Sequence, residues 1–415
     1  MAYLPRLVDS YLDGVLTQLP GLIVVGPRAT GKTTTISRRA RTVIRLAAAA
    51  EAAAFIADPD AALRGLEEPV LLDEWQEVPG VFGAAARAIN ADPRPSRYFL
   101  TGSVSAHLDN HVYAGTGRIV RMSMYPMTVK EKQGNANGAT FFDRFADGEE
   151  LSVPADTPDL RGYIDLALES GFPVAALLLN GAARDAALEG YIDDLLTHDV
   201  EQIEELQGRQ RGYDRMRLRS YFEAYALNSS GITDDKTLFD AAGIDRDTAL
   251  TYEQLLTDLF VAEQVPAWTS NRLTRLTHRP KRYLVDPALM TAALRIDANG
   301  VIRDGDLLGR VLDTFVSAQL RPEVPVSNTK PRLYHVRTKQ GRQEIDLLAE
   351  LGGERVIGME IKATAAPKSD DGKHLAWLRD QLGDRFVGGV VFHTGPRLYQ
   401  LNERIVAAPI SAIWG

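Results

Sequence analysis

Short apolar runs alternate with helix-like stretches over the first part of the chain. Residues 22–25, 70–72 and 98–100 are runs of strand length, and each is followed at once by glycine or polar residues. This alternation is typical of βαβ units and predicts a parallel sheet. Because open α/β sheets bind ligands at the carboxyl ends of their strands, we expect functional groups directly after these runs.

The pattern changes beyond this region. Residues 132–162 are rich in glycine, proline and polar side chains and predict a loop-rich segment. Residues 184–206 carry apolar positions at helical spacing and are expected to close the first domain. We therefore place a first domain at residues 1–206.

Residues 207–300 predict a small helical domain. Helical patterns lie around 215–228 and 248–260, and two strand-like runs, 266–268 and 281–285, follow them. Pairing of these two runs across the intervening segment would make the ribbon of a winged helix-turn-helix. The middle domain is therefore predicted to be a winged helix.

Residues 301–415 predict a third unit, again of the α/β class. An amphipathic helix near 309–320 precedes a helix at 374–381 and strand candidates at 332–337, 344–350, 356–361 and 388–392. The predicted fold class of the whole chain is α/β with a helical middle domain.

Composition narrows the possible classes of function. The chain has 415 residues, of which 45% are hydrophobic and 25% charged, as in ordinary globular proteins. It has no cysteine, which excludes disulfides, cysteine zinc sites, iron–sulfur clusters and thiol nucleophiles. The net charge of −8 disfavours a molecule that binds polyanions over its whole surface, but it leaves local basic patches open. Neither a signal-like start nor a long apolar run is present, so we expect a soluble, cytoplasmic protein without membrane contact.

A phosphate-binding motif follows the first strand candidate. Residues 26–33 match G-x-x-x-x-G-K-[ST], and Lys32 would reach the β- and γ-phosphates of ATP while Thr33 would bind Mg²⁺. A structural glycine turn is the alternative interpretation. The residues predicted to bind the nucleotide are Gly26, Pro27, Arg28, Ala29, Thr30, Gly31, Lys32, Thr33 and Thr34.

The next two strand ends supply the chemistry that such a loop needs. Asp73 is predicted to bind Mg²⁺ and Glu74 to activate the attacking water. Ser103 follows the third strand and is suited to sensing the γ-phosphate or aligning water. Arg118, and with it Arg121, is a candidate for neutralising charge on the transferred phosphoryl group, from its own chain or from a neighbouring one.

A second constellation lies near the end of the chain. Asp346 and Glu360 occupy strand candidates and could jointly bind Mg²⁺ or Mn²⁺, while Lys362 projects to the same face as Glu360 and could orient water. This is the D…ExK layout of restriction-type nucleases, and a solvated strand face is the alternative. Weaker candidates for the same cleft are Asp313, His374 and Gln381.

Two arginine-rich segments flank the predicted winged helix. These are the candidates for contacts to DNA phosphates. In the alternative interpretation, which we favour, the winged helix is a lid that packs on the nucleotide domain, and its arginines contact nucleotide or a partner subunit. The segments comprise Arg209, Arg211, Arg215, Arg217 and Arg219, and then Arg272, Arg275, Arg279, Lys281 and Arg282.

Nearly the whole chain resembles one family. The resemblance rests on GPRATGKT (26–33), LDE (72–74), LTGS (100–103), GR (117–118), YPMTVKE (125–131), GFP (171–173) and YLVDP (283–287). These motifs are similar to those of prokaryotic AAA-type ATPases that end in an uncharacterised domain resembling the restriction-endonuclease fold. The resemblance implies an AAA-type core, a winged-helix middle domain and a nuclease-like C-terminal domain, in that order.

The resemblance also assigns roles to single residues. It implies Lys32 and Thr33 at nucleotide and magnesium, Asp73 and Glu74 at metal and water, and Ser103 at the sensor position. It places the nuclease-like motif on Asp346, Glu360 and Lys362, and the family helix before this motif usually has glutamate where this chain has Asp313.

Three hypotheses for function follow. The first is an ATP-hydrolysing protein that acts on, or is regulated by, DNA through its C-terminal domain. The second is a nucleotide-dependent switch that recognises a protein partner and uses the nuclease-like fold only as a scaffold. The third is a winged-helix transcription factor gated by ATP. A homo-oligomer is expected if Arg118 acts on a neighbouring chain.

Overall fold

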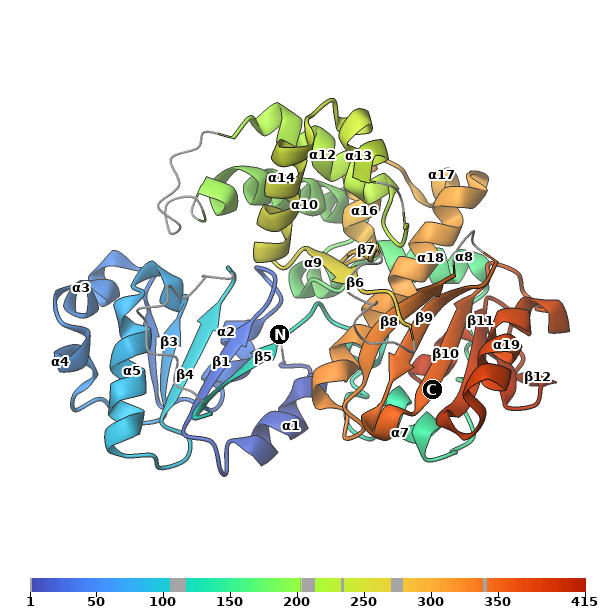
Figure 1. The fold of residues 1–415 in the computed structure, drawn as a ribbon. Helices are drawn as coiled ribbons and strands as arrows, with labels where there is room; N and C mark the ends of the chain where they lie inside the picture. Colours follow the sequence, from blue (N-terminus) through green and yellow to red (C-terminus); the bar gives the residue numbers. More distant parts are fainter. Residues whose placement is uncertain are drawn as a thin grey trace.

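The computed structural model describes residues 2–104, 117–201, 203, 213–232, 235–269, 279–338 and 342–415. Figure 1 shows three parts: a first sheet with its helices at the left, a mainly helical part at the top, and a second sheet at the right. The predicted ribbon turn and parts of both arginine-rich segments lie outside the described residues, including Arg209, Arg211, Arg272 and Arg275.

The first sheet has five parallel strands in the order β2-β3-β4-β1-β5. They are β1 (Gly21–Val25), β2 (Thr42–Arg45), β3 (Val70–Asp73), β4 (Tyr98–Gly102) and β5 (Ile119–Ser123). β1, β3 and β4 confirm the three predicted runs and their parallel pairing. The hydrophobic pattern does not single out β2 and β5, because both are partly exposed edge strands that carry an arginine.

Helices cover both faces of this sheet. α3 (Ala49–Ala57), α4 (Pro59–Leu63) and α5 (Gly80–Ala91) share a hydrophobic cluster with one face. α1 (Leu7–Val15) and α2 (Lys32–Ser37) pack on the other face. The carboxyl ends of the strands are left free of these helices for the loops that carry polar side chains.

The middle part begins with helices and ends with a short ribbon. Its elements are α8 (Leu160–Leu168), α9 (Pro173–Leu178), α10 (Gly181–Asp194), the π-helical turn η2 (Leu195–Asp199), α12 (Arg215–Leu227), α13 (Asp235–Ala242), α14 (Arg246–Asp258), β6 (Ala262–Val265) and β7 (Lys281–Leu284). α12 and α14 lie where helices are predicted, and β6 and β7 pair antiparallel. The winged-helix assignment of this part stays a prediction.

The predicted strand at residues 266–268 is wrong. The ribbon strand β6 ends at Val265, because Pro266 has no N–H to donate to a ladder. The carbonyl of Pro266 instead accepts a hydrogen bond from His335 N at 3.1 Å, and Ala267 forms a bridge to His335 in the second sheet. The chain after β6 therefore joins the C-terminal part.

The second sheet has the order β12-β13-β11-β10-β9-β8. β8, β9, β10 and β11 lie at the four predicted positions, and α18 and α19 at the two predicted helices. The elements are α16 (Pro287–Leu294), α17 (Ala298–Arg303), α18 (Gly305–Leu320), the 3-10 helix η3 (Arg321–Val326), β8 (Arg332–Arg337), β9 (Glu344–Glu350), β10 (Val356–Ile361), α19 (Lys373–Leu382), β11 (Phe386–His393), β12 (Tyr399–Asn402) and β13 (Ile405–Pro409).

The segment between the two sheets packs mainly away from the first one. This segment contains α6 (Val129–Lys132) and α7 (Phe141–Ala146). The helices that follow pack against later helices: α8 contacts α16, α17 and α18, and α10 contacts α16. The boundaries 1–206, 207–300 and 301–415 stay predictions. Among the described residues, no helix is both long and apolar enough to span a bilayer.

Candidate functional site

The phosphate loop leaves the carboxyl end of β1 and leads into α2. Gly26 has a φ of +150°, and a Cβ atom there would lie 2.0 Å from the carbonyl oxygen of Met124. Gly31 has a φ of +90° at the start of α2. Both conformations are costly for other residues, so the motif glycines are required by the path of the loop.

Lys32 is buried inside this loop. Its ammonium donates hydrogen bonds to the carbonyl oxygens of Gly26 at 3.0 Å and Pro27 at 2.8 Å. Burial lowers the pKa of Lys32 to about 8, although Glu74 and Asp73 oppose the effect. A buried cation that binds only loop carbonyls and lies near two acids is poised to accept an anion.

The two residues predicted to bind magnesium lie in direct contact. Thr33 Oγ1 donates a hydrogen bond to Asp73 Oδ1 at 2.7 Å, and Thr101 Oγ1 donates to the same oxygen at 2.5 Å. A hydroxyl and a carboxylate are the oxygen ligands that Mg²⁺ prefers. Thr33 and Asp73 therefore fit the ion, with the nucleotide phosphates supplying further oxygens.

Glu74 and Ser103 are also brought together. Glu74 has a left-handed backbone, with φ of 52°, and its Oε2 accepts hydrogen bonds from Ser103 N at 3.2 Å, Ser103 Oγ at 3.0 Å and Gln76 Nε2 at 2.6 Å. This local strain turns the carboxylate toward the end of β4. The sequence pattern gives no role to Gln76, whereas Thr101 belongs with Ser103 to the third strand end, whose hydroxyls are suited to sensing the γ-phosphate or aligning water.

The remaining loop residues contact other parts of the chain. Arg28 donates to Asp199 of η2 at 2.5 Å, and burial raises the pKa of Asp199 although Arg28 opposes it. Thr30 Oγ1 donates to the carbonyl oxygen of Pro27 at 2.9 Å. Ala29 has a φ of 62°, and Thr34 is exposed on α2.

Two residues that sequence reasoning missed support the loop from behind. Arg6 donates to the carbonyl oxygens of Thr30 and Tyr125, both at 2.8 Å, and forms an ion pair of 3.0 Å with Glu131. Both partners of this ion pair are almost fully buried. Glu131 lies within the YPMTVKE motif, so that motif was the sequence feature that could have identified Glu131 as part of the site.

Arg118 lies at the wrong edge of the sheet to act within its own chain. It precedes β5, whose first residue pairs with Gly21 at the start of β1, whereas the loop follows the end of β1. The strand rise puts these edges roughly 15 Å apart. Arg118 donates to Asn90 of α5, and Arg121 lies over the ring of Phe260 at 5.7 Å. A role for Arg118 on a neighbouring chain stays a prediction.

The C-terminal candidates also come together, but around a lysine. Lys281 of β7 lies 2.5 Å from Asp313 Oδ2 and 3.3 Å from Asp346 Oδ1. Burial raises the pKa of Asp313 to about 6 against the attraction of Lys281. Burial acts on Asp346 in the same direction, but Lys281 and the Ile361 N–H hold its pKa below the usual value.

Glu360 and Lys362 complete this cluster. Lys362 Nζ lies 3.2 Å from Glu360 Oε2, and Glu360 Oε1 is buried without a hydrogen-bond partner among the described residues. Burial, followed by the nearby Asp346, raises the pKa of Glu360 well above its usual value. His374 contacts Gln343 instead, and Gln381 is exposed.

This cluster does not fit a divalent metal ion in the present arrangement. The ammonium of Lys281 already lies between the two aspartates, and Mg²⁺ would need their oxygens at about 2.1 Å. Within the described residues, no group of three or more acidic or imidazole side chains is arranged to bind a metal ion.

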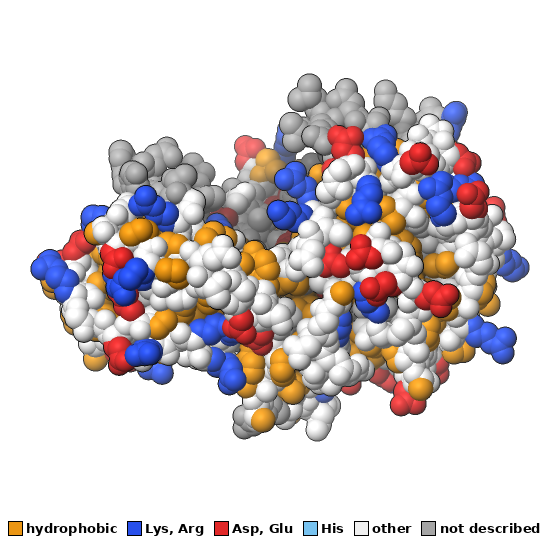
Figure 2. All heavy atoms as spheres, turned by 90° about the horizontal axis from the view of Figure 1, so that it is seen from below, with side chains coloured by type: hydrophobic (Ala, Val, Ile, Leu, Met, Phe, Trp, Pro, Cys, Tyr) orange, Lys and Arg blue, Asp and Glu red, His pale blue; other side chains and the backbone are white. Residues whose placement is uncertain are grey.

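Five described basic residues of the two arginine-rich segments are paired within the chain. Arg215, Arg217 and Arg219 form ion pairs with Glu201, Asp214 and Asp193, respectively. Lys281 and Arg282 are buried, and Arg282 lies 2.7 Å from Glu253. Burial of these two side chains corrects their assignment to a surface wing that binds DNA. Figure 2, which shows the molecule from below, has positive and negative side chains interspersed over the face drawn.

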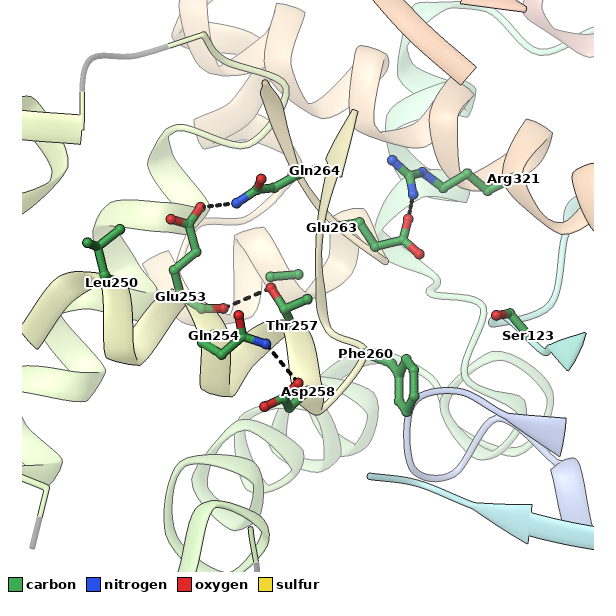
Figure 3. A pocket seen from close by; sticks show the side chains of 11 residues that line it. Ser123, Leu250, Glu253, Gln254, Thr257, Asp258, Phe260, Glu263, Gln264 and Arg321 are labelled. Atoms are coloured by element: carbon green, nitrogen blue, oxygen red, sulfur yellow. Dashed lines mark hydrogen bonds and ion pairs between the residues drawn. The ribbon is translucent and has the colours of Figure 1, made fainter. Parts of the chain in front are cut away.

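A separate cavity of about 670 Å³ lies between α14, β6 and the end of β5 (Figure 3). Acidic residues dominate the charges of its wall: Asp258 binds Gln254, Glu253 binds Gln264, and Glu263 pairs with Arg321. The residues that line it do not include the predicted site residues. An acidic cavity of this kind does not suit a nucleotide triphosphate.

Comparisons with known proteins found relatives of this chain and a solved structure that aligns with part of it. Uncharacterized proteins of Mycobacterium bovis and Mycobacterium tuberculosis are each 26% identical over 406 residues, covering 97% of this chain and 82% of the relative. A Walker-type ATPase of Pyrococcus abyssi aligns with a TM-score of 0.41 and 15% identity over 69% of this chain and 94% of its own.

Three family models match successive parts of the chain. Residues 160–300 match a domain of unknown function (DUF8612), and residues 308–413 match another (DUF4143). The restriction-endonuclease-like interpretation of the C-terminal part therefore stays a prediction. Residues 19–132, which include the phosphate loop, match the AAA domain.

Proposed function

We propose that this chain binds ATP with Mg²⁺ at the phosphate loop and hydrolyses it. The observation that carries the proposal is the direct contact of Thr33 with Asp73, beside the buried Lys32. These are the three groups that a P-loop enzyme uses to bind Mg²⁺ and the β- and γ-phosphates. Bound Mg²⁺ would neutralise charge on the phosphate oxygens.

The side chains then take separate roles. Lys32 exchanges its contacts to loop carbonyls for phosphate oxygens, and Glu74 accepts a proton from, or orients, the attacking water. Ser103 holds the Glu74 carboxylate at the end of β4. Arg28, which binds Asp199 in the free protein, lies on the loop and links it to the middle part.

Steady-state ATP hydrolysis by three variants tests this proposal. Lys32→Ala is expected to lose ATP binding and turnover, and Glu74→Gln to retain ATP binding but lose at least about 100-fold in kcat, since it removes only the group that acts on water. Glu67→Gln is the matched control, because its carboxylate is exposed and pairs with Arg41 at the surface. Unchanged turnover in Glu74→Gln would refute the assignment.

We further propose that ATP turnover drives a switch and that the C-terminal domain is its scaffold. The observation that favours a scaffold over a nuclease is the position of Lys281 among the acids. A panel of DNA and RNA, incubated with Mg²⁺ or Mn²⁺ and with or without ATP, is expected to stay intact. Cleavage that is lost in Lys362→Ala would restore the nuclease hypothesis.

Two properties of the proposed switch can be tested directly: the class of partner that this protein binds, and the oligomeric state of this protein. The intramolecular ion pairs of the arginines on α12 favour a protein partner over DNA. A footprint on DNA would favour a winged-helix DNA contact instead. Sedimentation with and without a non-hydrolysable ATP analogue tests whether a second chain brings Arg118 to the site.

A further inference from the structure

The ammonium of Lys281 is fully satisfied inside the C-terminal cluster. It reaches Asp313 Oδ2 at 2.5 Å, the carbonyl oxygen of Asp346 at 3.2 Å and Asp346 Oδ1 at 3.3 Å. An ammonium group has three donors and finds three acceptors here. The side chain is 4% exposed, so no water competes appreciably for these contacts.

The carboxylate oxygens of both aspartates are occupied as well. Tyr283, which lies on the same face of β7 as Lys281, donates to Asp313 Oδ1 at 2.9 Å. The N–H of Ile361 donates to Asp346 Oδ2 at 2.9 Å. A metal ion could therefore reach these aspartates only by displacing side chains that come from another part of the chain.

Side chains of strand β7 pair with acidic residues on two different helices. Lys281 and Tyr283 point toward Asp313 of α18, while Arg282, on the opposite face, pairs with Glu253 of α14. Lys281 thus binds β7 to the C-terminal part, and Arg282 binds the same strand to α14 within the middle part. The β-bridge between Ala267 and His335 of β8 is a further contact between the ribbon region and the C-terminal sheet.

We propose that Lys281 is the resident cation of the Asp313 and Asp346 cluster, in the position where a divalent ion would lie in a nuclease-like domain, and that it fastens β7 to the C-terminal sheet. Buried charges are stable only when they are paired and hydrogen-bonded, and this lysine supplies what a metal ion would otherwise supply. The cluster is therefore a metal-independent contact between two parts of the chain. Removing the lysine charge turns it into a divalent-cation site.

Mn²⁺ binding to the nucleotide-free full-length chain tests the proposal. Free Mn²⁺ is measured by electron paramagnetic resonance during titration of wild type, Asp346→Asn, Lys281→Met and the double variant Lys281→Met with Asp346→Asn. Wild type and Asp346→Asn are expected to bind equally. Lys281→Met is expected to gain one Mn²⁺ per chain, and the double variant to lose it again. All four proteins keep the site at Thr33 and Asp73, so any Mn²⁺ bound there does not contribute to the differences between them.

Two results would overturn the proposal. One is a Mn²⁺ ion that wild type binds and Asp346→Asn does not. The other is a folded Lys281→Met that gains no Mn²⁺. Lys373→Met, at an exposed lysine of α19, controls for loss of a positive charge elsewhere on the same domain and should gain none.

A stability measurement decides the matter if Lys281→Met does not fold. Asp313, whose side chain is 8% exposed, is then left buried without its cation, and Asp313→Asn removes that charge. The double variant Lys281→Met with Asp313→Asn is therefore expected to fold and to melt closer to wild type than Lys281→Met does. A double variant no more stable than Lys281→Met would show that the lysine does not serve as the counter-ion.

Discussion

A single carboxyl group, Glu323, is expected to make the protein less stable as the pH rises through neutrality. Glu323 lies on η3, is 1% exposed and accepts a hydrogen bond from the N–H of Phe141 at 2.6 Å. Burial raises the pKa of Glu323 to about 7, although Lys130 and the Phe141 N–H oppose the shift. The group is therefore largely protonated in mildly acidic solution and ionised above neutrality.

The sign and size of the effect follow from this pKa. The usual value is 4.5, so the folded protein binds more protons than the unfolded chain between pH 4.5 and about 7. The stabilisation that comes from proton binding by Glu323 is fully present below pH 4.5 and is lost as the pH rises through about 7. A gap of about 2.5 pKa units corresponds to about 3 kcal/mol, of which about 2 kcal/mol is lost between about pH 5.5 and about pH 8.

Glu323→Gln isolates this contribution. Glutamine keeps an oxygen that can accept from Phe141 but cannot ionise. The variant is expected to gain about 2 kcal/mol in unfolding free energy relative to wild type when the pH is raised from about 5.5 to about 8. Denaturant unfolding at both pH values, followed by tryptophan fluorescence, measures this difference.

A surface glutamate provides the matched control. Glu354 is half exposed and lies 3.4 Å from Arg385, so Glu354→Gln should show a difference from wild type that varies little with pH over the same range. If Glu323→Gln is no more dependent on pH than Glu354→Gln, the raised pKa of Glu323 is refuted.

Two further predictions concern the phosphate loop. Gly26→Ala is expected to cost more than about 1 kcal/mol and to abolish ATP binding, because the new methyl group meets the Met124 carbonyl oxygen. Gly14→Ala, inside helix α1 and with room for its added Cβ, is expected to raise stability by about 0.5–1 kcal/mol in thermal melting and to leave ATP binding unchanged in a titration. Asp199→Asn is expected to tighten ATP binding several-fold in a fluorescence titration, since it frees Arg28 and removes a negative charge beside the loop, while stability changes by less than about 1 kcal/mol. Weaker ATP binding would contradict this role for Asp199.

The parts of the fold that the sequence predicts best are those with a strong local signal. β1, β3 and β4 are uninterrupted apolar runs that are buried on both faces, so the pattern that identifies them is the pattern that their environment requires. Edge strands β2 and β5 lack this signal. The contact of Thr33 with Asp73 was also predictable, because β1 and β3 run parallel with only β4 between them, so their carboxyl ends lie at the same edge of the sheet.

Contacts between distant segments were not predictable in this way. Arg6 and Glu131 are separated by more than a hundred residues, and neither has a pattern that distinguishes a buried ion pair from two surface charges. Arg28 fits a motif, but its partner Asp199 lies in a helix whose packing is set by tertiary contacts. Such pairs are determined by the whole fold and not by spacing along the chain.

Lys281 shows why the charge of a segment does not reveal its role. Among Arg279, Lys281 and Arg282 it resembles one more cation of a basic wing, yet alternation along β7 sends Lys281 to Asp313 and Arg282 to Glu253. A buried cation without an acid would be too costly to keep, so the acids of α14 and α18 determine where the strand lies.

The middle part thus contacts the C-terminal cluster through β7 and the phosphate loop through Asp199. A change in the bond between Arg28 and Asp199 when ATP binds would act on a body that is already fastened to the C-terminal sheet, which is the connection that a nucleotide-driven switch requires.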